Sequence, residues 1–319
     1  MPTLLRAPTR GYSTPIVDAH RWDVFKPRDG DIVVATYPKC GTTWTQRIVD
    51  LLIHQSPAPR PLMDTYPWVD ATFFATNEEN MATIEAQTHR RAVKTHLPFD
   101  SLPIYSGMKY IHVARDGRDA CISMHNHQLG FTQDGKMIVG KQAMERGFTG
   151  PPPPPTPEDP REFYLQWIGM AEAEDRGEPA PDLNYFDYEM TYWRHRHDPN
   201  LLLVHYSDLK ANLAGEMRRI SSFLDIETPE NTLKALAHAA SFEQMKADGE
   251  ALLSSLHRFF DRGPDRFLNK GFNGRWKDIL TPEDLARYHA LAERKLSPDA
   301  RAWTEQGRLG AGDPVTLAD

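Results

Sequence analysis

The sequence contains little of what marks several large protein classes. Only two of its 319 residues are cysteine, Cys40 and Cys121, and they form neither a metal-binding motif nor a disulfide framework. No apolar run approaches the roughly 18 residues that cross a bilayer, and the N-terminus shows no apolar core of a signal peptide. The formal net charge is −7, which argues against a polybasic nucleic-acid-binding protein. These absences predict a cytoplasmic globular protein without a membrane span, in which both thiols stay free.

Short apolar segments alternate with segments of helical periodicity. Ile48, Leu51 and Leu52, for example, recur at three- and four-residue steps, as one face of a helix requires. The alternation predicts a single α/β domain over residues 1–319, with a central parallel sheet flanked by helices. The predicted strands are 31–36, 91–95, 109–114 and 201–206, and the predicted helices are 42–53, 117–127, 184–196 and 213–224.

Regular periodicity fails between about residues 128 and 162. Consecutive prolines occupy 151–155, and such a run favours an extended polyproline conformation. We interpret the segment as an inserted excursion of the single domain. The sequence leaves open whether it is functional or a plain solvated loop.

A polar turn joins the first buried strand directly to the following helix. Lys39, Gly41, Thr42 and Thr43 lie in this turn, where the first N–H groups of the helix are unpaired and its dipole favours anions. Glycine allows close approach of the backbone, and the threonines and lysine add donors and a charge. The turn predicts a phosphate-binding strand-loop-helix. It lacks the G-x-x-x-x-G-K-[ST] pattern of the usual nucleotide loop, and a plain strand-to-helix turn is the alternative.

Each predicted strand is followed by a polar or charged residue at the same edge of the sheet. These residues are Lys39, His96, Arg115 and Tyr206. Ligands of parallel sheets bind beyond the carboxyl ends of the strands. We therefore expect one site at this edge, with Arg115 either in that site or paired with a carboxylate such as Asp119.

Five motifs in one order resemble the cytosolic-type sulfotransferase family, which uses 3′-phosphoadenosine-5′-phosphosulfate (PAPS) as sulfuryl donor. They are YPKCGTTW at 37–44, KTHLP at 94–98, VARDGRDACIS at 113–123, SFEQMK at 241–246 and KGFNGRWK at 270–277. The resemblance implies that PAPS binds to Lys39, Cys40, Gly41, Thr42, Thr43, Trp44, Arg115, Ser123, Tyr206, Phe242, Asn269, Lys270 and Gly271.

The resemblance also assigns catalytic roles. His96 matches the family's base, which accepts the proton of the acceptor hydroxyl. Lys39 and Lys94 would offset charge on the transferring group. Ser123 would hold Lys39 away from the donor until the acceptor binds. No metal is implied, and the pairs His125/His127 and His195/His197 do not converge on one ion, because residues two apart on a helix point about 200° apart.

Several positions depart from the family pattern. Cys40 stands where serine is common, and Asn269 stands where arginine is usual, which puts one contact to the 3′-phosphate in doubt. Ala240 replaces a common threonine. The family's C-terminal dimerisation motif is half present, with Pro282 and Ala286 at altered positions, so the sequence leaves the oligomeric state open.

The acceptor is expected to be a small apolar or aromatic molecule with a hydroxyl group. Aromatic residues that could wall its pocket are Tyr66, Trp68, Phe73, Phe74, Phe131, Phe148 and Tyr185. Two other functions remain open. One is a non-catalytic member that binds PAPS or its product 3′,5′-adenosine bisphosphate (PAP), and the other is a nucleotide-dependent kinase, which would need Mg²⁺ ligands.

Overall fold

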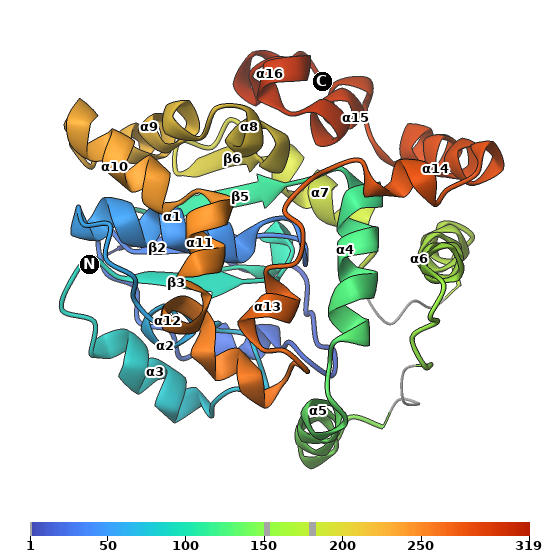
Figure 1. Ribbon diagram of the computed structural model, residues 1–319, viewed down its shortest axis with the longest axis horizontal. Helices are drawn as coiled ribbons and strands as arrows, with labels where there is room; N and C mark the ends of the chain where they lie inside the picture. Colours follow the sequence, from blue (N-terminus) through green and yellow to red (C-terminus); the bar gives the residue numbers. More distant parts are fainter. Residues whose placement is uncertain (1, 150–153, 179–182) are drawn as a thin grey trace.

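A parallel sheet of four strands forms the centre of the molecule, in the order β3-β2-β5-β6 (Figure 1). The computed structural model describes residues 2–149, 154–178 and 183–319. The strands are β2 (Ile32–Ala35), β3 (Ala92–Thr95), β5 (Lys109–Ala114) and β6 (Leu201–His205). Every residue of β2 and β3 is buried, as expected for strands that are covered on both faces. The predicted strands are confirmed to within a residue at each end.

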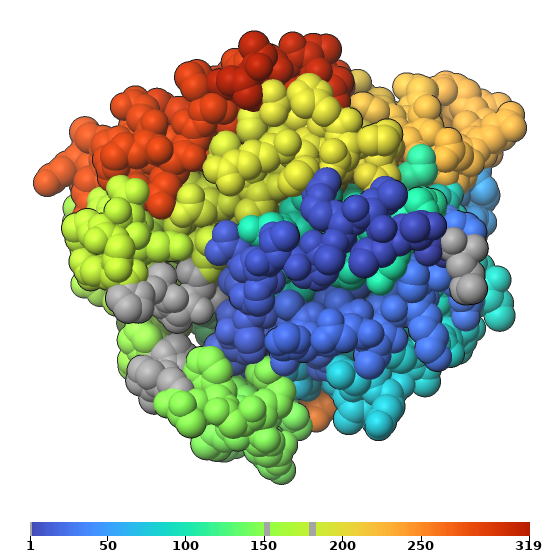
Figure 2. Space-filling view, turned by 180° about the vertical axis from the view of Figure 1, so that it is seen from behind, coloured from blue at the N-terminus to red at the C-terminus, as the bar shows by residue number. Residues whose placement is uncertain are grey.

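Helices surround this sheet, and a short antiparallel pair joins β1 (Leu4–Arg6) to β4 (Ile104–Tyr105). Figure 2 shows the N-terminal residues lying across the back of the molecule. The α-helices are α1 Thr42–His54, α2 Leu62–Thr65, α3 Asn77–Glu85, α4 Gly117–Leu129, α5 Gln133–Glu145, α6 Pro160–Asp175, α7 Tyr185–Trp193, α8 Tyr206–Ala211, α9 Leu213–Phe223, α10 Glu230–Ala239, α11 Phe242–Ala247, α12 Gly249–Leu253, α13 Pro264–Phe267, α14 Pro282–Lys295, α15 Pro298–Gln306 and α16 Arg308–Ala311. The 3₁₀ helices are η1 Ala19–Trp22, η2 Phe99–Ser101, η3 Ser254–Arg258, η4 Arg275–Asp278 and η5 Pro314–Thr316.

Successive residues of β2 enter two hydrophobic cores on opposite faces of the sheet. Ile32 and Val34 pack with residues of α1, α9 and α10, whereas Val33 and Ala35 pack with residues of α6, α7 and α14. The strand geometry causes this division, because neighbouring side chains point to opposite faces. The uninterrupted β-branched run therefore encodes a buried parallel strand.

The predicted excursion at 128–162 is more helical than its composition indicates. Helix α4 continues to Leu129, α5 occupies Gln133–Glu145, and α6 begins at Pro160. The Thr132 side chain caps α5 by accepting from Gly135 N, and the Asp159 side chain caps α6. These two capping residues mark the helix starts. The prolines and glycines of the segment had instead indicated an irregular excursion. Residues 151–153 of the proline run lie outside the described residues, and 154–157 form neither helix nor strand.

The two cysteines, Cys40 and Cys121, are buried and free, as predicted. Among the described residues, the helices are too short or too polar to span a bilayer.

Candidate active site

The turn between β2 and α1 leaves the start of α1 uncapped. Gly41 takes the N-cap position with φ 118°, and no side chain there bonds to the first turn. Lys39 also has a left-handed backbone, with φ 72°. Thr42 and Thr43 line the same cavity as Lys39. The free N–H groups, the dipole and the lysine make this turn a site suited to an anion.

Gly41 also brings the turn close to the neighbouring strand end. A Cβ atom on Gly41 would lie 3.1 Å from the Tyr206 ring. The positive φ and this contact both favour glycine. Tyr206 is the first residue of α8 and directly follows β6. The turn between β2 and α1 therefore packs against an aromatic ring at the end of β6.

A chain of hydrogen bonds links this turn to His96. Thr42 Oγ1 lies 2.6 Å from Thr36 Oγ1, and His96 Nδ1 lies 2.8 Å from the Thr36 carbonyl oxygen. A carbonyl only accepts, so Nδ1 carries the proton and donates it. The lone pair of Nε2 is therefore the part of the ring that accepts a proton.

Asp70 fixes His96 from the other side. One carboxylate oxygen accepts from His96 N at 3.2 Å and from Trp68 Nε1 at 2.7 Å. The Trp68 ring stands edge-on to His96 with centroids 4.7 Å apart, and Lys94 Nζ lies 4.9 Å from its centroid. One buried carboxylate thus holds both the backbone of His96 and the Trp68 ring that contacts its imidazole.

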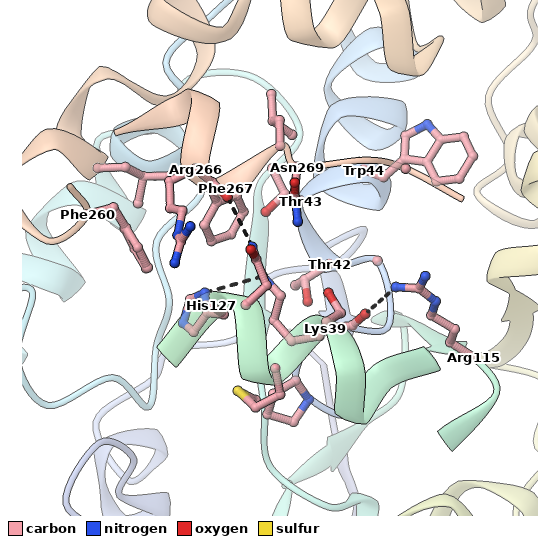
Figure 3. A pocket seen from close by; sticks show the side chains of 18 of the residues that line it. Lys39, Thr42, Thr43, Trp44, Arg115, His127, Phe260, Arg266, Phe267 and Asn269 are labelled. Atoms are coloured by element: carbon pink, nitrogen blue, oxygen red, sulfur yellow. Dashed lines mark hydrogen bonds between the residues drawn. The ribbon is translucent and has the colours of Figure 1, made fainter. Parts of the chain in front are cut away.

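The Lys39 side chain reaches toward the aromatic end of the cavity (Figure 3). Its Nζ lies 3.3 Å from His127 Nδ1 and 4.1 Å from the Phe267 ring centroid. Ser123 lines the same cavity, but the contact of Lys39 recorded in this structure is with His127 rather than Ser123. The holding role of Ser123 stays a prediction.

Burial shifts the basic groups of the site toward their neutral forms. It lowers the pKa of Lys39 to about 7, with further lowering by the charges of Arg115 and Lys94. It lowers the pKa of Lys94 to about 8, although Asp70 opposes the shift. The pKa of His96 falls to about 3 through burial and the Lys94 charge. Nothing in the sequence indicates this last shift of the His96 pKa, which keeps the imidazole neutral at physiological pH.

Arg115 lies at the end of β5 and crosses to the C-terminal loop. It donates to Asn273 Oδ1 at 3.1 and 3.0 Å and to the Lys39 carbonyl oxygen at 3.2 Å. The guanidinium also lies 4.2 Å from the Tyr206 ring centroid. Asp119, the alternative partner considered from the sequence, instead accepts from Gly274 N at 2.8 and 2.9 Å. Arg115 therefore lines the cavity with no ion pair to a carboxylate among the described residues, although its charge opposes the rise in the pKa of Asp119 that burial causes.

Arg275 is a cavity residue that the sequence reasoning missed. It lines the cavity together with Lys210, Asn269 and Lys270, and burial and the Arg115 charge lower its pKa. Its only recorded hydrogen bond within the described residues runs from the backbone N to Asp119, at 3.3 Å. Its position in KGFNGRWK, one of the five motifs, was the signal available in the sequence.

The aromatic positions of the donor side also meet in the structure. Trp44 donates from Nε1 to the Ala240 carbonyl oxygen at 2.7 Å, and its ring lies 5.2 Å from that of Tyr206. Gly271 has φ 65°, and a Cβ atom there would collide with the Phe242 ring. Cys40 is the exception among the predicted donor residues, because its buried side chain does not line the cavity.

The end of the cavity that is expected to take the acceptor is aromatic, but only some of the predicted residues form it. Trp68, Phe73, Phe74 and Phe131 line the cavity, whereas Tyr66, Phe148 and Tyr185 do not. The hydroxyl groups of the two tyrosines form hydrogen bonds in the core. Tyr66 donates to Asp50 Oδ1 at 2.8 Å, and Tyr185 donates to the Arg115 carbonyl oxygen at 2.7 Å. Residues that sequence reasoning missed at this end are Met63, His127, Leu256, Phe259, Phe260, Arg266 and Phe267.

The sequence comparisons identify the family. A family model described as the sulfotransferase domain matches residues 29–298. A glycolipid sulfotransferase of Mycobacterium bovis is 32% identical over 317 residues, which cover 94% of this chain and 95% of the relative. Sulfotransferase 1B1 of Mus musculus is 28% identical over 300 residues, which cover 90% of each chain.

Solved structures share the fold. Retinol dehydratase in complex with androsterone and the inactive cofactor PAP superposes with a TM-score of 0.66 at 22% identity, covering 88% of this chain and 84% of that chain. A mouse sulfotransferase complexed with PAP superposes with a TM-score of 0.63 at 21% identity, covering 89% and 91%. These likenesses confirm the α/β architecture with a central parallel sheet.

Proposed function

The chain belongs to the sulfotransferase family, and from this premise we propose that it transfers the sulfuryl group of PAPS to a hydroxyl group of a small, apolar or aromatic acceptor, with His96 as the base. One observation carries the proposal. A single cavity joins the uncapped start of α1 to His96, Lys94 and a wall of phenylalanines. An anionic donor and an apolar acceptor would therefore meet at His96.

The residues at the donor end fit the charges of PAPS. Arg115, Lys270 and Arg275 line the part of the cavity beside Tyr206 and would hold the 3′-phosphate. Arg275 would supply a positive charge there. This charge would compensate for the one that is lost because Asn269 stands where the family usually has arginine. The free N–H groups and hydroxyls at the start of α1, with Lys39, would hold the 5′-phosphosulfate.

Trp44 and Phe242 would enclose the adenine of the donor. Both line the cavity, and aromatic faces stack on nucleobases regardless of the base's polar edge. The bond from Trp44 to the Ala240 carbonyl oxygen fixes the ring. The nucleoside would then lie beside Trp44 and Phe242.

His96 would take the proton of the acceptor hydroxyl as its oxygen attacks sulfur. The Thr36 carbonyl oxygen holds the proton on Nδ1, which leaves Nε2 free to accept. With a pKa of about 3 the imidazole starts neutral. The negative charge of the bound donor raises that pKa, because an opposite charge favours the protonated ring.

Lys39 and Lys94 would offset negative charge during the transfer. The acceptor oxygen forms a new bond to sulfur, the bond from sulfur to the 5′-phosphate oxygen breaks, and the phosphate leaves as an anion. Both lysines line the cavity beside the start of α1 and His96. In a site with little water, their charges stabilise the departing phosphate more strongly than in solution.

Ligand-dependent thermal unfolding tests the donor assignment. PAP at about 100 times its dissociation constant should add about 2.7 kcal/mol to the free energy of unfolding. ADP, which lacks the 3′-phosphate, should stabilise the protein much less, and an Arg115→Ala variant should lose the difference between the two. Stabilisation by Mg·ATP without stabilisation by PAP would favour a kinase, and turnover of PAPS with a phenol separates an enzyme from a non-catalytic binder.

A further inference from the structure

Arg266 brings a charged side chain to the aromatic end of the cavity. It lies in α13 and lines the cavity beside Phe260 and Phe267. Figure 3 shows its guanidinium group pointing toward His127. The side chain is 16% exposed. A mostly buried arginine is unexpected in a wall made largely of phenylalanine side chains.

Gly130 makes the room for this arginine. A Cβ atom on Gly130 would collide with Arg266 Nε. The backbone of Gly130 has φ −82°, an ordinary value that any residue adopts, so its conformation does not require glycine. The absence of a side chain at the end of α4 instead lets the guanidinium enter the cavity.

Among the described residues, the guanidinium has no recorded hydrogen-bond acceptor. Its Nε is buried and has no hydrogen-bond partner, and the side chain makes no recorded hydrogen bond within the described residues. Asp261 Oδ1 lies 3.7 Å from Nε, which is too far for a hydrogen bond. The Asp261 side chain is 50% exposed, so water screens the pair.

Two buried arginines, Arg47 and Arg91, have hydrogen-bond partners that Arg266 lacks among the described residues. Arg47 donates to Asp50 at 2.6 Å, and Arg91 donates to Asp31 from Nε at 2.8 Å. Buried charges are normally paired in this way, because an unpaired charge loses its hydration without replacement. Arg266 therefore has N–H donors that the described part of the chain leaves unused.

The surroundings add positive potential. Arg266 adds a positive charge to the aromatic end, and no Asp or Glu lines the cavity within the described part of the chain. Lys39 and Lys94 line the same cavity and are basic, although burial lowers their pKa values to about 7 and about 8. His127, between Lys39 and Arg266, is held neutral, since burial and the Lys39 charge lower its pKa well below the ordinary value. A cavity of one sign attracts ligands of the opposite sign.

Building on the proposed function, we propose that Arg266 selects acceptors that carry an anionic oxygen group, such as a carboxylate, besides an apolar aromatic body and the hydroxyl group that receives the sulfuryl group. The planar guanidinium would bind the carboxylate through two N–H groups. The phenylalanines would hold the body, and the hydroxyl would point to His96. Arg266 would thus determine specificity without taking part in the transfer.

A matched series of acceptors tests this assignment. We would compare para-hydroxyphenyl carboxylic acids of increasing chain length with their methyl esters, measuring kcat/KM with PAPS and binding to the PAP-loaded protein. At least one acid should exceed its ester about tenfold or more, in line with a charged hydrogen bond. Arg266→Met should abolish this preference, mainly through the KM of the acid, and leave the ester nearly unchanged.

Two further variants keep the outcome clear. Arg262→Met removes an exposed charge from the same segment and should leave the acid preference intact. Gly130→Ala keeps the charge but closes the space that Arg266 occupies, so it should lower the preference as well. The proposal is overturned if the esters are preferred, if neither set binds, or if Arg266→Met affects acids and esters equally. Failure of PAP itself to bind would instead overturn the donor site.

Discussion

Lys39 should take up a proton when the donor binds. Burial and the charges of Arg115 and Lys94 lower its pKa to about 7 in the ligand-free protein. The phosphates of the donor favour the ammonium, so the pKa in the complex should return toward the ordinary value of about 10.4. Above pH 7 the ligand-free protein has lost this proton and must regain it to bind. The affinity for PAP should therefore fall about tenfold per pH unit, which is about 1.4 kcal/mol.

Isothermal titration calorimetry of PAP between about pH 7.5 and 9 measures this slope. Phosphate monoesters, with a second pKa of about 6, are already fully ionised there and add no slope of their own. Buffers of different ionisation enthalpy report the proton uptake directly. Lys39→Arg stays charged throughout and should lose most of the slope, although Lys94, with a pKa of about 8, adds a part at the upper end. An unchanged affinity across the range, or an equal slope in Lys39→Arg, would refute the reasoning.

Three further results are expected. His96→Gln should lower kcat by about 10²- to 10⁴-fold with little change in the Kd of PAP, and near-normal turnover would contradict the assignment of the base. Arg275→Ala should weaken PAP binding about 10-fold or more without weakening ADP binding, and Asn269→Arg in that background should restore it; equal losses for both nucleotides would argue against a 3′-phosphate contact. Asp50→Ala should destabilise the fold by about 3–5 kcal/mol in chemical denaturation, because it leaves the buried charge of Arg47 unpaired, and an unchanged midpoint would contradict this.

The sheet and the donor end were predictable because local sequence specifies them. The β-branched run at Ile32–Ala35 forms a buried strand wherever helices cover both faces. The turn that follows carries its chemistry in consecutive residues, from Lys39 to Thr43. The ends of parallel strands meet at one edge, so Arg115 and His96 were expected beside this turn, and they line the same cavity.

Helix α5 and part of the acceptor end were not predictable in the same way. Gly135 and Gly140 weakened the helical pattern of α5, and only the capping threonine marked its start. Tyr66 and Tyr185 have the composition of pocket residues, but hydrogen bonds to Asp50 and to the Arg115 carbonyl oxygen draw them into the core. Aromatic side chains serve cores and pockets equally well, so composition alone does not separate the two.

The sequence by itself determined the α/β fold, the anion-binding turn and the identity of the residues around it, because these depend on short-range patterns and on the common edge of parallel strands. Only the tertiary structure decided the neutral state of His96, the contact of Lys39 with His127 and the entry of Arg266 into the cavity. Each of these depends on burial and on residues that are distant in the sequence: Lys39 and His127 are 88 residues apart, and His96 and Thr36 are 60 residues apart. Desolvation and long-range proximity exist only once the chain has folded.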